Sequence, residues 1–159
     1  MLTTPRVAFP LRFLLVVLFG LLVVFQVLSL PGQFAHLAEE SPDLAPLRWP
    51  LTAVSVFCVL CAQVVVVATW KLLTLVERDR IFREGASPWV DAIVWAIAAA
   101  WVALLGGFGW VASTWDDPGP PLLLLLLLAG VAALGLLVVV MRALLRQATT
   151  LRTDMDAVI

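Results

Sequence analysis

The chain has 159 residues, of which 63% are hydrophobic and 13% are charged, and its mean hydropathy is +1.07. Soluble globular domains are about 45–50% apolar and about 25% charged, and one small core cannot hide this much apolar surface. The composition therefore excludes a water-soluble domain, so the excess apolar surface must face lipid. The net charge of −1 points to neither nucleic acid nor an anionic surface as a partner.

Four runs that contain neither a charged residue nor a histidine follow one another along the chain. They cover residues 13–30, 51–70, 92–112 and 122–141. A helix of about 20 residues crosses a hydrocarbon core about 30 Å thick, so each run can span a membrane. We therefore predict an all-α fold, an integral membrane antiparallel four-helix bundle, with residues 1–159 forming a single four-span domain.

The basic residues predict the orientation of these spans. Nine of the ten lie before the first span, between the second and third, or after the fourth, and only Arg48 lies on the opposite side. Lys and Arg near the spans are retained in the cytoplasm. We therefore expect a multi-pass protein of the cytoplasmic (plasma) membrane with both termini inside, a cytoplasmic loop 71–91 and cytoplasmic helical extensions that include a tail helix 142–159.

A cleaved signal peptide is an alternative for the N-terminus, because Arg6 and Arg12 precede an apolar run. That run continues to Leu30, which is longer than a usual signal-peptide core, and no clean A-x-A cleavage site follows it. The first run is therefore expected to remain as a span.

The segment 31–50 contains four prolines, so we expect an irregular outer cap with one short turn. Its His36 stands near two glutamates, but one histidine with loosely spaced carboxylates fixes no metal geometry, and solvated loop residues are expected. Cys58 and Cys61 form a C-x-x-C pattern seven to ten residues inside a span, with no cation nearby in the sequence. Two buried structural thiols are expected there rather than a redox pair.

Three intramembrane polar residues, Gln26, Ser55 and Gln63, interrupt the apolar runs. Counted from the ends of those runs, the two glutamines differ in depth by about 10 Å, which is too far for a direct bond. Ser55 matches the depth of Gln26. We therefore predict that Gln26 bonds to Ser55 or Thr52, and that the glutamines serve helix packing.

The third span carries a stripe of small residues spaced by three or four, and the fourth span has small residues near Gly135. The stripe consists of Ala92, Ala96, Ala99, Ala103 and Gly107. Small side chains let a neighbouring backbone approach closely, so we expect the third and fourth spans to pack tightly. Asp91 is expected in the first turn of the third helix, where the helix dipole stabilises a carboxylate.

Apolar residues of the tail alternate in spacings of four and three, which puts them on one helical face. They are Leu144, Ala148, Leu151, Met155 and Val158. The central loop, a second copy or another protein could cover this face. We predict packing of Leu144, Leu151 and Met155 against Leu72, Leu75 and Ile81 or Phe82. Acid–base pairs are expected along the rim, between Arg78, Arg80 or Arg83 and Asp154 or Asp156.

Two short motifs accompany the four-span layout. Arg80-Ile81-Phe82 follows the second span, and an acidic then aliphatic tail, Leu151–Ile159, ends the chain. Over nearly its whole length the chain resembles the four-span bacterial family DUF2975, in particular its actinobacterial members. The resemblance implies no established activity. In some members it implies pairing with a small cytosolic helix-turn-helix regulator.

We find no catalytic, cofactor-binding or metal-binding pattern, so we expect a protein that is not an enzyme, binds no cofactor and does not bind nucleic acid directly. The favoured function is a membrane protein that presents its cytoplasmic loop and amphipathic tail to a protein partner, with homo-oligomers left open. The residues expected to bind the partner are Arg78, Arg80, Ile81, Phe82, Arg83, Leu144, Leu151, Asp154, Met155, Asp156 and Val158. The alternative is a small transporter or channel subunit that acts as an oligomer, with a water-filled route lined by Gln63, Ser55 or Thr69.

Overall fold

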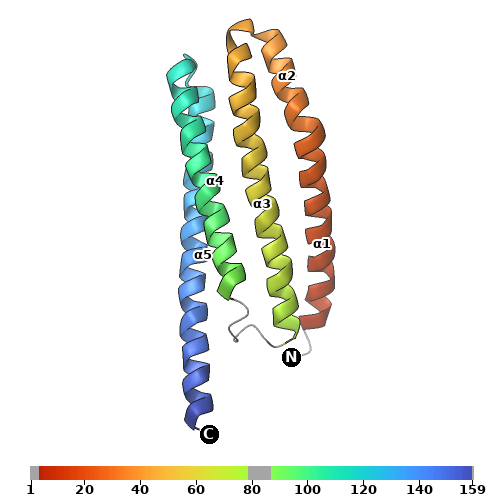
Figure 1. Ribbon diagram of the computed structural model, residues 1–159, viewed down its shortest axis with the longest axis vertical. Helices are drawn as coiled ribbons and strands as arrows, with labels where there is room; N and C mark the ends of the chain where they lie inside the picture. The colour runs from red at the N-terminus through yellow and green to blue at the C-terminus, as the bar shows by residue number, and fades with distance from the viewer. Residues whose placement is uncertain (1–3, 79–86, 159) are drawn as a thin grey trace.

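A computed structural model describes residues 4–78 and 87–158, and helices account for nearly all of them (Figure 1). In chain order they are α1 (Thr4–Val24), the π-helix η1 (Phe25–Ser29), α2 (Leu30–Glu40), the 3-10 helix η2 (Pro42–Leu47), α3 (Arg48–Glu77), α4 (Ser87–Thr114) and α5 (Gly119–Val158). Helix α1 begins, and α3 and α5 finish, at the same end of the molecule, here called the terminal end (Figure 1). The predicted all-α fold is confirmed.

Four helical segments are long and apolar enough to cross a membrane. They are Arg6–Glu40, Ala45–Glu77, Ser87–Thr114 and Gly119–Val158. At most 22% of the residues in the most apolar stretch of each are buried inside the molecule. Exposed apolar surface on this scale needs lipid, and helices satisfy their own backbone hydrogen bonds there. The chain is therefore a multi-pass membrane protein.

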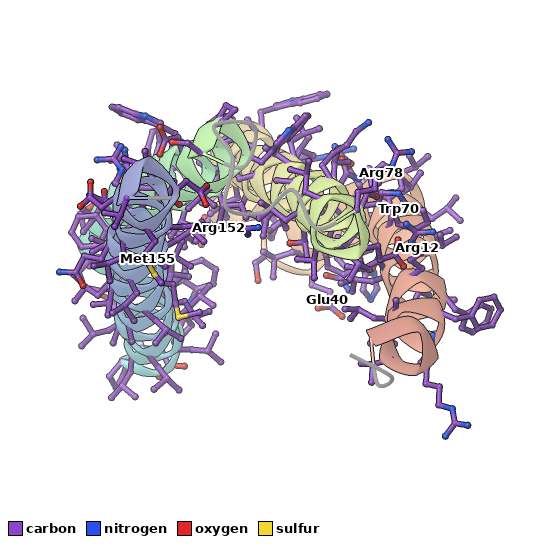
Figure 2. The ribbon with its side chains drawn as sticks, turned by 90° about the horizontal axis from the view of Figure 1, so that it is seen from below. Arg12, Glu40, Trp70, Arg78, Arg152 and Met155 are labelled. Carbon is purple, nitrogen blue, oxygen red and sulfur yellow. The ribbon has the colours of Figure 1, made fainter. Side chains whose placement is uncertain are left out.

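The helices pack side by side in the order α1, α3, α4, α5, and α2 continues α1 along α3. Seen along the helix axes, this row bends into a crescent with α1 and α5 at its two tips (Figure 2). The four long helices therefore form an open arc, in which every helix keeps a broad face for lipid or for another protein.

The centre of the arc is the contact between α3 and α4, and these two helices carry most of the buried side chains that the structure describes. A Cβ atom added to Gly107 of α4 would lie 3.5 Å from Val54 Cγ1 of α3, and Ala92 shares a cavity with α3 residues. The small-residue stripe therefore faces α3 rather than α5. Contact of α4 with α5 is also close, because a Cβ on Gly135 would come within 3.1 Å of Ile97 Cγ2. The predicted close packing of the third and fourth spans, α4 and α5, is thus confirmed. The small residue at this contact is Gly135 of α5 and not the stripe on α4.

The expected irregular cap over residues 31–50 is wrong, because this segment forms α2 and η2. Pro31 and Pro42 occupy the first turns of these two helices. A missing N–H costs nothing there, since the first amides of a helix have no partner within it. The π-helix η1 joins α1 to α2 without a break, and a π-turn accommodates an extra residue inside a continuing helix.

Candidate functional site

The contact between α1 and α3 is tied at the terminal end by an arginine. Arg12 forms an ion pair with Glu77, and its Nη2 atom donates a 3.4 Å hydrogen bond to Thr74 Oγ1. Its guanidinium also lies 5.6 Å from the centre of the Trp70 ring, and Figure 2 shows the two side chains between the helices. A charge that lies beside lipid is thus neutralised and stacked on an aromatic face.

The other two helix contacts carry a cation at a comparable position. Lys71 of α3 lies 5.9 Å from the centre of the Trp89 ring, which is on α4. Arg142 Nε of α5 lies 2.7 Å from Asp91 Oδ1 of α4. Neither of these two atoms makes an aligned hydrogen bond, so the contact between them is an ion pair. Every neighbouring pair in the row is therefore joined by a cationic side chain near the terminal end.

We call this set the charged girdle: Arg12, Lys71, Glu77, Asp91 and Arg142. Its ion-paired side chains are 29–35% exposed, so they lie at the boundary between apolar surface and water. Tryptophan prefers the same zone of a membrane, and two indoles lie against the girdle's cations. The girdle ties each long helix to its neighbour in the row at one level, and its paired charges offer no reactive group.

The expectation for Asp91 is wrong in detail. No acidic residue lies in the first turn of α4, because the helix begins at Ser87 and Asp91 is its fifth residue. Its partner is the Arg142 guanidinium rather than the free amides of the helix end. Sequence reasoning missed this pair because the two residues are 51 positions apart.

The two membrane-embedded glutamines bind each other. Gln63 Nε2 donates a 3.0 Å hydrogen bond to Gln26 Oε1, and Gln63 is buried. The predicted bond from Gln26 to Ser55 or Thr52 is therefore wrong; Thr52 Oγ1 donates to the Arg48 carbonyl at 2.6 Å. Gln26 itself lies in η1, the π-helical turn.

The register of α1 against α3 explains why the depth estimate failed. Fourteen residues separate Arg12 from Gln26, and fourteen separate Gln63 from Glu77. In an antiparallel pair, equal spacing from one contact places the second pair at the same level. The prediction takes the end of the apolar run at Leu30 as the end of the span, but the helix continues past that residue into α2. This equal spacing is the sequence signal that could have revealed the pair.

Gln63 also lines a cavity of about 240 Å³ between α1, α3 and α4. Its other lining residues are apolar or aromatic: Phe19, Leu60, Val64, Val67, Ala68, Trp89 and Ala92. Such a cavity offers one amide among hydrocarbon, which suits an acyl chain better than a polar solute. Ser55 is half-buried on α3 and does not line this cavity.

The remaining candidates do not assemble a reaction centre in the part of the chain that is described. Cys58 and Cys61 are free thiols, and Cys58 Sγ lies 4.0 Å from the Ala100 carbonyl oxygen. His36 Nε2 lies 3.3 Å from Glu40 Oε1, one turn along α2, and both side chains are largely exposed. Over residues 4–78 and 87–158, no three His, Cys, Asp or Glu side chains gather as a metal site would require.

The residues expected to bind a partner lie at the terminal end where they are described. Leu144, Leu151, Asp154, Met155, Asp156 and Val158 are exposed on α5 beyond the girdle, and Arg78 is exposed at the end of α3. Arg80, Ile81, Phe82 and Arg83 lie outside the described residues.

The predicted packing of the tail against the second span is wrong for the described residues. Leu144, Leu151 and Met155 are 55%, 64% and 68% exposed. In the row, α4 stands between α5 and α3 (Figure 2). Because α5 also extends further than α3 at the terminal end (Figure 1), the tail has no helix of its own molecule beside it there among the described residues.

One family model matches the chain over residues 32–159, and its description is Protein of unknown function (DUF2975). The match includes α2 to α5 and leaves most of the first span outside, which is less than the nearly whole-chain resemblance expected from the sequence. No curated protein and no solved structure matches the chain. Since the match covers most of the chain, the protein belongs to the DUF2975 family.

Proposed function

We propose that this protein is a non-enzymatic, multi-pass protein of the cytoplasmic membrane that presents its terminal end to a soluble protein partner. The observation that carries the proposal is the extension of α5. This helix continues 16 residues beyond Arg142, which is about 24 Å. The extension carries exposed apolar and charged side chains outside the apolar span.

The charge distribution supports a cytoplasmic position for the terminal end. Seven of the eight basic residues that the structure describes belong to the segments at this end, and they include Arg12, Lys71, Arg78 and Arg142. The opposite end has Arg48 beside acidic residues of α2, η2 and the α4–α5 turn. Basic residues beside spans stay in the cytoplasm. The proposed topology is therefore an antiparallel helix arrangement with both termini inside.

The surface at this end suits a protein partner with charges of both signs. Arg78 is exposed where α3 ends, whereas Asp154 and Asp156 are exposed near the end of α5. A partner that contacts both helices would meet a basic side chain on α3 and two acidic side chains on α5, which favours one orientation of docking. A small helix-turn-helix regulator is the partner class that the family resemblance suggests.

Transport is less well supported as a function. A route for solutes needs polar groups that are free to bind them, yet Gln26 and Gln63 bind each other. The Thr69 hydroxyl donates a 2.7 Å hydrogen bond to the Val65 carbonyl of its own helix. The cavity beside Gln63 is otherwise apolar.

Affinity capture from native membranes tests the proposal. We expect the full chain to retain a soluble cytoplasmic protein that a variant ending at Thr150 does not retain. The captured protein should also bind the purified full chain in proteoliposomes, with a preference over the shortened chain of at least about tenfold, which is 1.4 kcal/mol.

Topology labelling provides the control for this capture. In full and shortened chains that lack Cys58 and Cys61, Ser41→Cys should react with an impermeant reagent in intact cells, whereas Ser87→Cys should not. Labelling of Ser87→Cys in intact cells would overturn the topology. Equal retention of the captured protein by both chains would overturn the role of the tail.

A further inference from the structure

We propose that a second copy of this chain docks along α5, and that the two helices form a parallel coiled coil running from the membrane into the water. The docking line, here called the α5 seam, begins at Leu123 and ends at Val158, and its positions alternate in spacings of four and three. Leu134, Leu137, Leu144 and Leu151 lie on it, and each other position is Leu, Gly, Met, Ala or Val. An average period of 3.5 residues is the pattern of a left-handed coiled coil.

Nothing in the described part of the chain covers the seam along its length. Its side chains are exposed at every position except Ala148, which is half-buried, and Leu134 and Leu151 are 59% and 64% exposed. The contact of α5 with α4 uses a different face of the helix. That face includes Leu128, whose carbonyl accepts a 3.2 Å hydrogen bond from Trp101 Nε1, and Arg142. One face of α5 therefore attaches to α4, and the seam faces outward.

Lipid can cover only the upper part of the seam. Below Arg142 the positions off the seam become mostly polar, as at Arg146, Gln147, Thr150 and Thr153, whereas the seam itself stays apolar. Apolar side chains in such a stripe are typical of a helix that packs against another element in water. An element that stands beside the tail must therefore cover this part.

The identity of that element follows from the continuity of the seam. No polar residue interrupts the seam where α5 leaves the apolar span, and Met141 and Leu144 follow one another across this level. A helix that follows the seam over its length of about 52 Å must itself span the membrane and project by a similar distance. The α5 helix of a second copy has this length and polarity, because both copies insert in the same direction.

The flanking positions are compatible with a parallel pair. In this arrangement, a residue beside the seam faces the residue five positions further along the other helix, so Gln147 faces Arg152 of the second copy. No like charges meet at that position. The aqueous part of the seam is too short to be stable as an isolated helix pair. Membrane anchoring removes this difficulty, since it holds the tails at high effective concentration.

The inference rests on the proposed function only in taking the tail to be an interaction surface. It assigns the apolar side of the tail to a second copy, and it leaves Arg78, Asp154 and Asp156 for the soluble partner. A dimer would then present two tails side by side.

Disulfide trapping in native membranes tests the seam. In the full chain carrying Cys58→Ala and Cys61→Ala, single cysteines are introduced by Leu144→Cys and Leu151→Cys on the seam. Arg146→Cys and Thr153→Cys, on the opposite side of the same helix, are the matched controls. All four positions are exposed, so none of the variants removes a buried contact. Under a copper–phenanthroline oxidant, the seam cysteines should form a product of twice the monomer mass at least about tenfold faster, because a disulfide needs Cβ atoms about 4 Å apart.

Leu137→Cys extends the test into the span, and it should form the same product. Equal rates at seam and control positions, or no dimer at the seam, would overturn the proposal. A seam product of another mass would overturn it too, since it would identify a different membrane partner. Trapping confined to the tail would also overturn it, because the second copy is inferred from the continuity of the seam into the membrane. Capture of the soluble partner is measured separately, so either proposal can fail while the other holds.

Discussion

Helix α3 meets its two neighbours in different ways. Its contact with α4 is made by small and apolar side chains, and Ala68 on α3 is only 1% exposed. Its contact with α1 has fewer buried side chains, since Ala8 and Leu15 are the buried ones among the described side chains of α1. That contact adds two polar ties, one at Arg12 and one at Gln26.

The difference reflects the membrane as a solvent. Lipid tails are as apolar as leucine, so helices gain little from burying apolar surface against each other. Close packing is available where small residues let the backbones approach, as at Gly107 against Val54. A Cβ atom added to Gly20 of α1 would have no neighbouring atom within 4 Å, so this glycine does not bring α1 close to another helix. At the α1–α3 contact, the polar pairs of Arg12 with Glu77 and of Gln26 with Gln63 fix how the two helices align.

The largest effect is expected from overfilling the α3–α4 contact. Gly107→Leu should lower the free energy of unfolding by about 1–3 kcal/mol, because a Cβ atom there already lies 3.5 Å from Val54 Cγ1 and leaves no space for the rest of the side chain. Gly106→Leu is the control and should not lower it, since a Cβ atom at that exposed position has no neighbouring atom within 4 Å. Both variants replace a glycine by leucine in the same turn of α4, so they differ in packing and not in helix propensity. Unfolding by SDS in mixed micelles, followed by circular dichroism, gives both values, and equal losses would refute the packing difference.

An intermediate effect is expected at the α4–α5 end of the girdle. Asp91→Asn and Arg142→Gln should each cost about 1 kcal/mol, since each leaves a partner without its counter-charge near lipid. The double variant should cost no more than either single variant, because the interaction is already lost. Asp116→Asn, exposed in the turn before α5, serves as the control and should be neutral. Additive costs in the double-mutant cycle would show that the ion pair contributes nothing.

The smallest effect is expected at the glutamine pair. Gln26→Leu and Gln63→Leu should each cost about 0.6 kcal/mol, the average for hydrogen bonds between helices in membranes. The double variant should be as stable as the wild type or more stable, since no unpaired amide then remains in the hydrocarbon. Gln33→Leu, which removes a 3.0 Å bond to Ser29 Oγ within the same segment, should show no coupling to Gln63→Leu. A double variant that is less stable than both single variants would contradict a direct pair.

Features that depend on a short stretch of sequence were predicted correctly. Span length is a local property of about 20 residues, so the four spanning helices could be derived before any packing was known. The periodicity that gives the tail an apolar face is local too, whereas the exposure of that face was not predicted. The family resemblance depends on the same local pattern of spans and short motifs. Two of the prolines on which the irregular cap was predicted, Pro31 and Pro42, occupy the first turns of α2 and η2, where proline is tolerated, and a third, Pro46, lies inside η2.

The sequence by itself determined the number of spans, the level of the basic residues and the periodicity of α5. Only the tertiary structure decided which side chains meet. Arg12 and Glu77 are 65 residues apart, and so are no closer in the chain than many pairs that do not touch. Their contact depends on the axial register and the rotation of whole helices. Many weak packing contacts together determine that register and rotation. The same register brings Gln26 to Gln63, and the packing of α5 on α4 leaves the α5 seam exposed.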